Sequence, residues 1–105
     1  KETLDPFKAG EEQFRLYEYF PYEEDRNFEI YMMEVGPGVT YSSDGHGEHT
    51  FEYLTVFSGC LQLTTEGQTY EVRAGNSIRF PTVMAHTYHN PSEELLRISV
   101  TFTWQ

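Results

Sequence analysis

The four histidines of this 105-residue chain fall into two close pairs, His46 with His49 and His86 with His89. Side chains three residues apart point to opposite faces of an extended strand, so at most one member of each pair faces a shared interior. Glu52 follows the first pair closely. Two imidazoles and one or two carboxylates brought together would form a site for Zn, Fe, Mn or Ni. The alternative is that these are exposed loop side chains that bind no metal.

Strand alternation indicates which of these side chains can share an interior face. In the first segment it selects the even-numbered residues His46, Glu48 and Glu52. In the second segment it selects His86, Tyr88 and Asn90. A barrel that brings the two sets together would line a small cavity with them.

Motifs for several other chemistries are absent from the sequence. It has no Gly-rich phosphate loop, no paired Cys-x-x-Cys and no His-Glu-x-x-His. The single cysteine, Cys60, has no neighbouring residue that would activate a thiolate, and it excludes an internal disulfide. One unpaired cysteine is typical of a reducing compartment, so we expect the protein in the cytoplasm.

Short apolar runs alternate with Gly and Pro turn signals along most of the chain. Strands are expected at Phe28–Val35, Phe51–Phe57, Cys60–Thr65, Gln68–Arg73, Ser77–Phe80, His86–Asn90 and Leu95–Trp104. No segment keeps a helical period over three turns. The pattern predicts an all-β sandwich or barrel.

The acidic first part of the chain, residues 1–27, is expected to be an N-terminal arm or linker with one candidate strand at Phe14–Phe20. Residues 28–105 would form the barrel. Seven Lys and Arg stand against seventeen Asp and Glu, for a formal charge of −10. Such a surface repels phosphates, so binding of nucleic acid or anionic lipid by these residues is excluded. No apolar run is long enough for a membrane span, and because the chain begins Lys-Glu-Thr, we expect a fragment of a longer protein.

Two stretches resemble the two sequence motifs of the cupin superfamily. The first cupin motif is His-x-His, three or four residues, Glu, six residues and Gly, and it is similar to the segment from His46 through Glu52 to Gly59. The second has Gly, Pro, His and Asn at spacings found here in Gly75, Pro81, His86 and Asn90. The resemblance covers residues 28–104 and implies a double-stranded β-helix, the cupin jelly-roll barrel, with an N-terminal arm.

The resemblance also implies a set of metal ligands. Cupins that bind metal use the two His and the Glu of the first motif and the His of the second, which correspond to His46, Glu52 and His86. Glu48 stands at the position of the second His, where its carboxylate is a candidate substitute, and His49 is an alternative if the strand bulges. One divalent ion, Zn, Ni, Fe or Mn, is the implied cofactor. Tyr88 is a further candidate for contact with a small ligand.

A narrower resemblance is to the C-terminal cupin sensor domain of bacterial regulators with an N-terminal Xre-type helix-turn-helix. It is carried by Phe20-Pro21-Tyr22, Glu52-Tyr-Leu-Thr-Val-Phe-Ser-Gly59 and Ala85-His-Thr-Tyr-His-Asn-Pro91. In those regulators the second His of the first motif is often lost, as it is here. The implied function is to sense a small-molecule effector, without catalysis, while an upstream domain binds DNA.

Two other interpretations stay open. One is a stand-alone metal-dependent cupin dioxygenase, isomerase or decarboxylase that uses His46, Glu52 and His86. The other is a sugar-binding barrel. For the regulator we expect a homodimer, with exchange of the aromatic segment Phe14–Tyr22 between subunits as a specific hypothesis.

Overall fold

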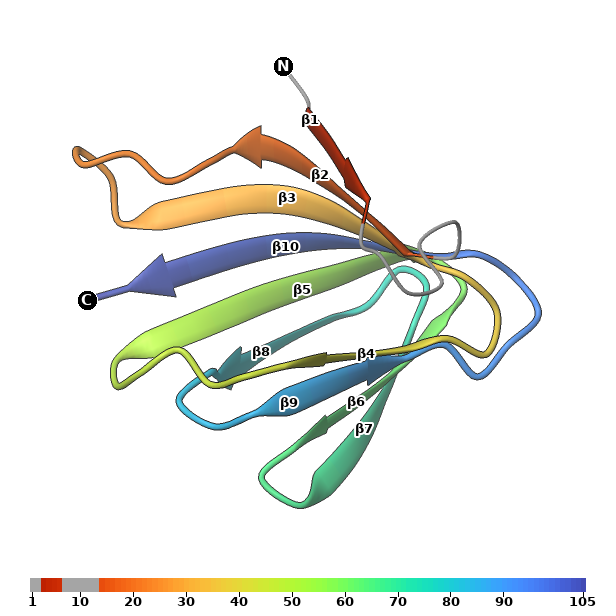
Figure 1. Cartoon of the computed structure of the whole chain (residues 1–105). Coiled ribbons are helices and arrows are strands. Elements are labelled where there is room, and N and C mark those ends of the chain that lie inside the picture. The colour runs from red at the N-terminus through yellow and green to blue at the C-terminus, as the bar shows by residue number, and fades with distance from the viewer. Residues whose placement is uncertain (1–2, 7–13) are drawn as a thin grey trace.

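The structure is a computed structural model that describes residues 3–6 and 14–105 (Figure 1). Within these residues every regular element is a β-strand, so the predicted all-β class is confirmed. The strands are β1 (Thr3–Pro6), β2 (Phe14–Phe20), β3 (Phe28–Val35), β4 (Thr40–Ser43), β5 (Thr50–Ser58), β6 (Cys60–Thr65), β7 (Gln68–Arg73), β8 (Ser77–Pro81), β9 (His86–His89) and β10 (Leu96–Trp104). The described part of the chain therefore contains no helix with the length and hydropathy to cross a membrane.

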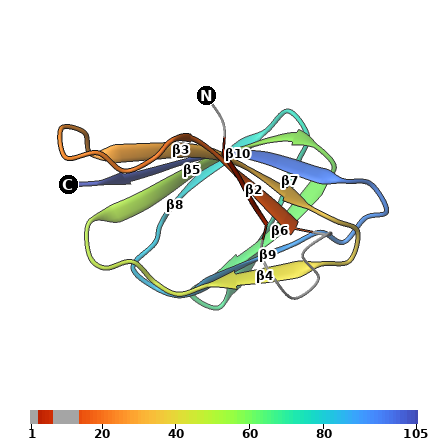
Figure 2. The same cartoon turned by 45° about the horizontal axis from the view of Figure 1, so that its top comes forward.

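The strands form two antiparallel sheets that face each other (Figures 1 and 2). The six-stranded sheet has the order β1-β2-β3-β10-β5-β8, and the four-stranded sheet has the order β4-β9-β6-β7. Their inner faces share one core of buried apolar side chains, which are Phe14, Met33, Val35, Leu54, Val56, Leu61, Leu63, Val72, Phe80, Tyr88, Leu96, Ile98 and Val100. Two facing antiparallel sheets agree with the predicted jelly-roll barrel.

Alternation along the strands decides which side chains enter this core. In β10, Leu96 and Ile98 are buried while Arg97 between them is exposed. In β5, Leu54 and Val56 point inward in the same way. Full burial of one such side chain stabilises the fold by about 1.5–3 kcal/mol, so the pattern fixes the face of each strand.

The predicted strand bounds hold for β3, β6 and β7, and those of β5, β8, β9 and β10 change by at most one residue at either end. The four-residue strand β4 was not predicted. It carries the polar sequence Thr-Tyr-Ser-Ser and becomes a strand through its pairing with β9. Strand β1 was not predicted either, and it pairs with β2.

The N-terminal segment contributes β2 to the larger sheet. Its residues pair with β3, and the register shifts between Glu18 and Phe20. Phe14 at its start is buried in the core. The division into an arm at residues 1–27 and a barrel at 28–105 stays a prediction, and residues 1–2 and 7–13 of the arm lie outside the described residues.

Strand register brings the candidate site residues to one end of the barrel. In the six-stranded sheet, Phe102 of β10 pairs with Glu29 of β3 on one side and with Glu52 of β5 on the other. In the four-stranded sheet, His86 opens β9 and pairs with Ser43 of β4. Glu52 and His86 therefore face each other across the space between the sheets.

Candidate functional site

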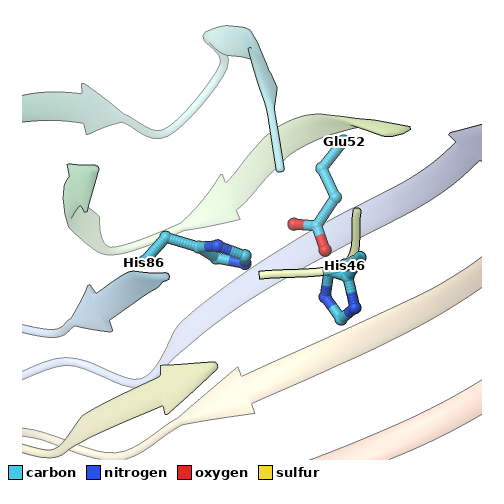
Figure 3. Close-up of side chains that lie close together, drawn as sticks. All are labelled: His46, Glu52 and His86. Carbon is cyan, nitrogen blue, oxygen red and sulfur yellow. The ribbon is translucent and has the colours of Figure 1, made fainter. Parts of the chain in front are cut away.

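Three residues predicted as ligands converge at this end of the barrel, as Figure 3 shows. They are His46 in the loop before β5, Glu52 in β5 and His86 at the start of β9. One potential ligand atom from each lies within 4.8 Å of the others. Segments 40 residues apart thus supply one cluster, as the two motifs predicted.

Glu52 is a buried carboxylate with 2% of its surface exposed. The Tyr88 hydroxyl donates a hydrogen bond of 2.5 Å to Glu52 Oε1. Burial raises the pKa of Glu52 to about 7, against the smaller opposing effect of the Tyr88 hydrogen bond. This buried glutamate therefore changes its charge near neutral pH.

His86 is buried as deeply, and only one of its ring nitrogens has a partner. Nδ1 lies 3.0 Å from the carbonyl oxygen of Met84. A carbonyl oxygen can only accept, so Nδ1 carries the proton of the neutral ring and Nε2 presents a lone pair. Nε2 is buried without a hydrogen-bond partner. Burial lowers the pKa of His86, with the Met84 carbonyl acting against it, which favours the neutral imidazole.

His46 is held by the backbone of its loop rather than by a strand. Its backbone N–H donates to the Thr82 carbonyl oxygen over 2.7 Å. The preceding Gly45 packs so closely that a Cβ atom there would lie 2.1 Å from the Val83 carbonyl oxygen. The His46 ring is more exposed than that of His86, and their centroids are 5.7 Å apart. Burial lowers the pKa of His46, and the neighbouring His86 lowers it further, while Asp44 acts in the opposite direction.

Glu48 and His49 do not join this cluster. The group of ligand atoms found within the described residues contains neither of them, and both side chains are exposed. Strand alternation was expected to place Glu48 beside His46, but β5 begins only at Thr50. The chain turns just before it, with positive φ angles of 106° at Gly47 and 65° at His49. Alternation cannot be carried through such a turn.

A cavity of about 110 Å³ lies beside the cluster, between the two sheets. It is lined by Phe14, Leu16, Tyr31, Met33, Tyr41, Ser43, His46, Glu52 and Tyr88. His46, Glu52 and Tyr88 were predicted as candidate ligand contacts. Tyr31 and Tyr41 were not. Alternation within residues 28–35 places Tyr31 and Met33 on one face, which was the available signal, whereas Tyr41 lies in the unpredicted strand β4.

The donor set fits a divalent metal ion with three protein ligands. The lone pair of His86 Nε2 is unpartnered, and burial favours neutral imidazoles at both histidines, which is the form that binds metal. Ligands at about 2.1 Å from one tetrahedral ion are about 3.4 Å apart, so the three atoms, which lie within 4.8 Å of one another, would take that spacing when an ion is bound. Such an ion would supply Lewis acidity, while Tyr88 would orient the Glu52 carboxylate through its hydrogen bond.

Comparison with known families decides what this barrel is. A family model described as a cupin domain matches residues 31–102. The chain belongs to the cupin family. The superfamily resemblance drawn from the two motifs is thereby confirmed, together with the jelly-roll fold.

Among curated relatives of this cupin chain, the HTH-type transcriptional regulator SutR of Escherichia coli strain K12 is 28% identical over 75 residues. That match covers 71% of the chain and 42% of the regulator, so the chain spans less than half of that relative. An uncharacterized protein, SCO3923 of Streptomyces coelicolor, is 29% identical over 85 residues, or 81% of the chain and 78% of that protein.

Solved structures show the same cupin fold in regulators. The cupin domain of an XRE family transcriptional regulator from Enterobacter cloacae matches with a TM-score of 0.83 at 22% identity, over 89% of this chain and 98% of that one. An HTH_3 family transcriptional regulator from Vibrio cholerae matches with a TM-score of 0.85 at 21% identity, over 95% of this chain and 56% of that one. This cupin domain is therefore related to the cupin domains of XRE-type regulators.

Proposed function

We propose that this cupin domain senses a small-molecule effector for a bacterial transcriptional regulator whose helix-turn-helix domain lies upstream of residue 1. The observation that carries the proposal is the 28% identity with an HTH-type regulator, of which the matched region makes up 42%. The remainder of that relative leaves room for a DNA-binding domain. With a formal charge of −10, the cupin domain itself would stay away from DNA phosphates.

The cavity supports the sensing part of the proposal. It is small, lies between two rigid sheets and combines apolar walls with a few polar groups, which is the usual composition of a small-ligand pocket. Its polar wall is formed by Ser43, His46, Glu52 and Tyr88 with the hydroxyls of two further tyrosines. We propose that effector contacts are made by His46, Glu52, His86 and Tyr88, in the cytoplasm and without catalysis.

Signal transmission requires an arrangement of subunits that the effector can bias. A ligand with equal affinity for two arrangements shifts neither, so the effector must bind one arrangement more tightly. A homodimer would present two DNA-binding domains to two half-sites. The exposed rings of Phe20 and Tyr22 are candidate dimer contacts. Sedimentation of the wild type and of the F20S/Y22S double variant should give dimer and monomer; equal masses would remove this part of the proposal.

The proposal has two direct tests. A thermal-shift screen of small metabolites on the 105-residue chain should yield compounds that raise the melting temperature of the wild type and of Glu93→Gln, but not of Glu52→Gln. Glu93 is exposed in the turn before β10, so its substitution removes the same charge outside the cavity. Intact mass and N-terminal sequencing of the protein from its own cells should find an upstream helix-turn-helix segment. A native chain that begins at Lys1 would overturn the regulator role.

A metal-dependent enzyme is the second candidate, favoured by the cluster of His46, Glu52 and His86. Three protein ligands leave coordination positions open for substrate and water or oxygen. Chain loaded separately with Zn, Ni, Fe or Mn would have to turn over candidate diols, thiols or keto acids. Loss of turnover in Glu52→Gln would support this function, and turnover that persists in the variant would exclude the assigned site.

A further inference from the structure

We propose that the ligand of the cavity is a small organic ammonium ion. This inference rests on the proposed function, since it names the chemical class of the effector at the same site. It is carried by three features of the cavity and the adjoining cluster: acceptor atoms with unused capacity, aromatic rings in the lining, and the absence of Lys and Arg among the described lining residues.

Two buried residues of the cluster beside the cavity, His86 and Glu52, keep hydrogen-bond acceptor capacity that no donor among the described residues uses. His86 Nε2 has a lone pair, because Nδ1 uses its proton on the Met84 carbonyl, and Nε2 has no partner. Glu52 accepts one hydrogen bond from Tyr88 at Oε1, which leaves further acceptor capacity on a carboxylate that can take about four. A ligand that satisfies both residues must therefore bring hydrogen-bond donors, and an ammonium group brings up to three.

The spacing of these atoms also suits an ammonium nitrogen. The ligand atoms of His46, Glu52 and His86 lie within 4.8 Å of one another. Acceptors at hydrogen-bond length, about 2.9 Å, from one tetrahedral nitrogen are about 4.7 Å apart. Ligands at about 2.1 Å from a tetrahedral metal would be only about 3.4 Å apart. The upper limit of 4.8 Å therefore leaves room for an ammonium nitrogen among the three acceptors.

The remaining wall fits the alkyl part of such an ion. Tyr31, Tyr41 and Phe14 present rings to the cavity, and Leu16 and Met33 complete its apolar lining. Phe14 stacks on Tyr41 with centroids 4.4 Å apart, which builds a continuous aromatic surface. Ring faces attract cations, and they do so most strongly where water is excluded. These apolar groups would contribute nothing to a bare metal ion.

Among the described residues, no ion pair compensates the carboxylates at and near the cavity. None of the described residues that line it is Lys or Arg. Glu29 of β3 pairs with Phe102 on the side of β10 opposite to Glu52. Burial raises the pKa of Glu29, and the neighbouring Glu18 raises it further. The ion pairs found within residues 14–105 join Arg73 to Glu71 and Arg97 to Glu34, so they neutralise none of these three glutamates. A cationic ligand would supply the missing charge.

The test compares three probes of one size on chelator-treated chain. The cavity of about 110 Å³ holds roughly four water volumes, so the probes are propylammonium, 1-propanol and propionate. Binding is followed by ¹⁵N-resolved NMR titration. Propylammonium should bind at least tenfold more tightly than the neutral and anionic probes, with a Kd no lower than roughly tens of micromolar for so small a ligand.

Variants locate the interaction. Glu52→Gln should weaken propylammonium binding at least tenfold, while Glu93→Gln, with the same change in net charge, should leave it unaltered. Tyr41→Leu serves as a second variant, from a partly exposed strand. It should weaken the binding of propylammonium at least threefold more than the binding of 1-propanol.

Each contrary result has a distinct meaning. Equal or tighter binding of 1-propanol or propionate would overturn the ammonium assignment and leave the sensing function standing. Binding of none of the three probes, or of Zn²⁺ alone, would overturn it as well. The sensing function is judged separately by the metabolite screen, so both proposals fail together only if that screen also finds no ligand.

Discussion

Two buried polar residues on one face of the segment that begins with β9, His86 and Asn90, have opposite hydrogen-bonding environments. Asn90 donates to the carbonyl oxygens of Val35 and Glu94 over 2.8 Å each, and its side-chain oxygen accepts from the backbone and hydroxyl of Ser92. His86 uses one nitrogen and leaves the other unpaired. Buried polar groups are normally satisfied. Asn90 therefore holds the fold together, and His86 is available to a ligand.

The same division runs along the strands of the larger sheet. Near Asn90, the sheet is closed by Val35, Val56 and Leu96, whose side chains are fully buried. Near His86, two of these strands, β3 and β5, contribute Tyr31 and Glu52 to the lining of the cavity. We infer that one end is packed for stability, and we propose that the other binds a ligand. The substitutions below test that division, in order of expected effect.

Asn90→Leu should have the largest effect on stability. It removes two donated and two accepted hydrogen bonds at a site without solvent, so we expect the free energy of unfolding to fall by roughly 3–4 kcal/mol. Urea denaturation followed by circular dichroism measures the loss. A loss below about 1 kcal/mol would contradict a structural role for Asn90.

Glu52→Gln should make stability less dependent on pH. Because the pKa of Glu52 is raised from its usual 4.5 to about 7, the folded protein holds this proton more tightly than the unfolded chain. The stability due to the proton is fully present below about pH 4.5 and is lost as the pH rises through 7. In metal-free samples, the free energy of unfolding of the variant should therefore rise relative to that of the wild type between pH 5 and pH 8, by roughly 3 kcal/mol at most.

Glu93→Gln serves as the control in the same urea titrations at pH 5 and pH 8. It should follow the wild type at both values, because Glu93 is exposed. A constant difference between Glu52→Gln and the wild type across this range would show that Glu52 does not titrate there.

Two truncations compare the packed end with the cavity end. Val56→Ala opens a void in fully buried packing and should cost about 2 kcal/mol. Leu16→Ala extends an existing cavity from a half-buried position, and should cost about 1 kcal/mol or less. Thermal unfolding of both variants gives the ranking, and the reverse order would contradict the assigned division.

His86→Phe should have the smallest effect on stability. The slightly larger phenyl ring stays among the aromatic neighbours Phe80 and Tyr88, and the unpaired Nε2 disappears together with the hydrogen bond to Met84. We expect a change within about 1 kcal/mol in either direction, measured by urea denaturation. Calorimetry with Zn²⁺ should at the same time show loss of metal binding, and Zn²⁺ affinity equal to wild type would exclude His86 as a ligand.

Much of the fold could be predicted because apolar alternation and Gly or Pro turns are local signals. Residues 28–35, 60–65 and 68–73 carry both, and their bounds agree with the structure. Thr40–Ser43 carries neither, since its four polar or aromatic residues become a strand only by pairing with β9. Such a long-range contact leaves no local pattern in the sequence.

The candidate site was predicted in part. Glu52, His86 and Tyr88 lie in regular strands, where alternation gives the correct face. Glu48 and His49 lie where backbone φ becomes positive and the chain turns, so alternation gave no valid prediction for them. Tyr31 and Tyr41 line the cavity because the fold brings together five strands, β2, β3, β4, β5 and β9, and no single stretch of sequence contains this information.

The central claim is that the end of the barrel near His86 binds a small molecule while the end near Asn90 does not. The most direct measurement is a protein-observed NMR screen of the 105-residue chain with assigned backbone and side-chain resonances. The account predicts that hits shift the signals of His46, Glu52 and Tyr88 and leave those of Asn90 and Val56 in place. Hits that perturb only the Asn90 end, or an outer face of the sheets, would contradict it.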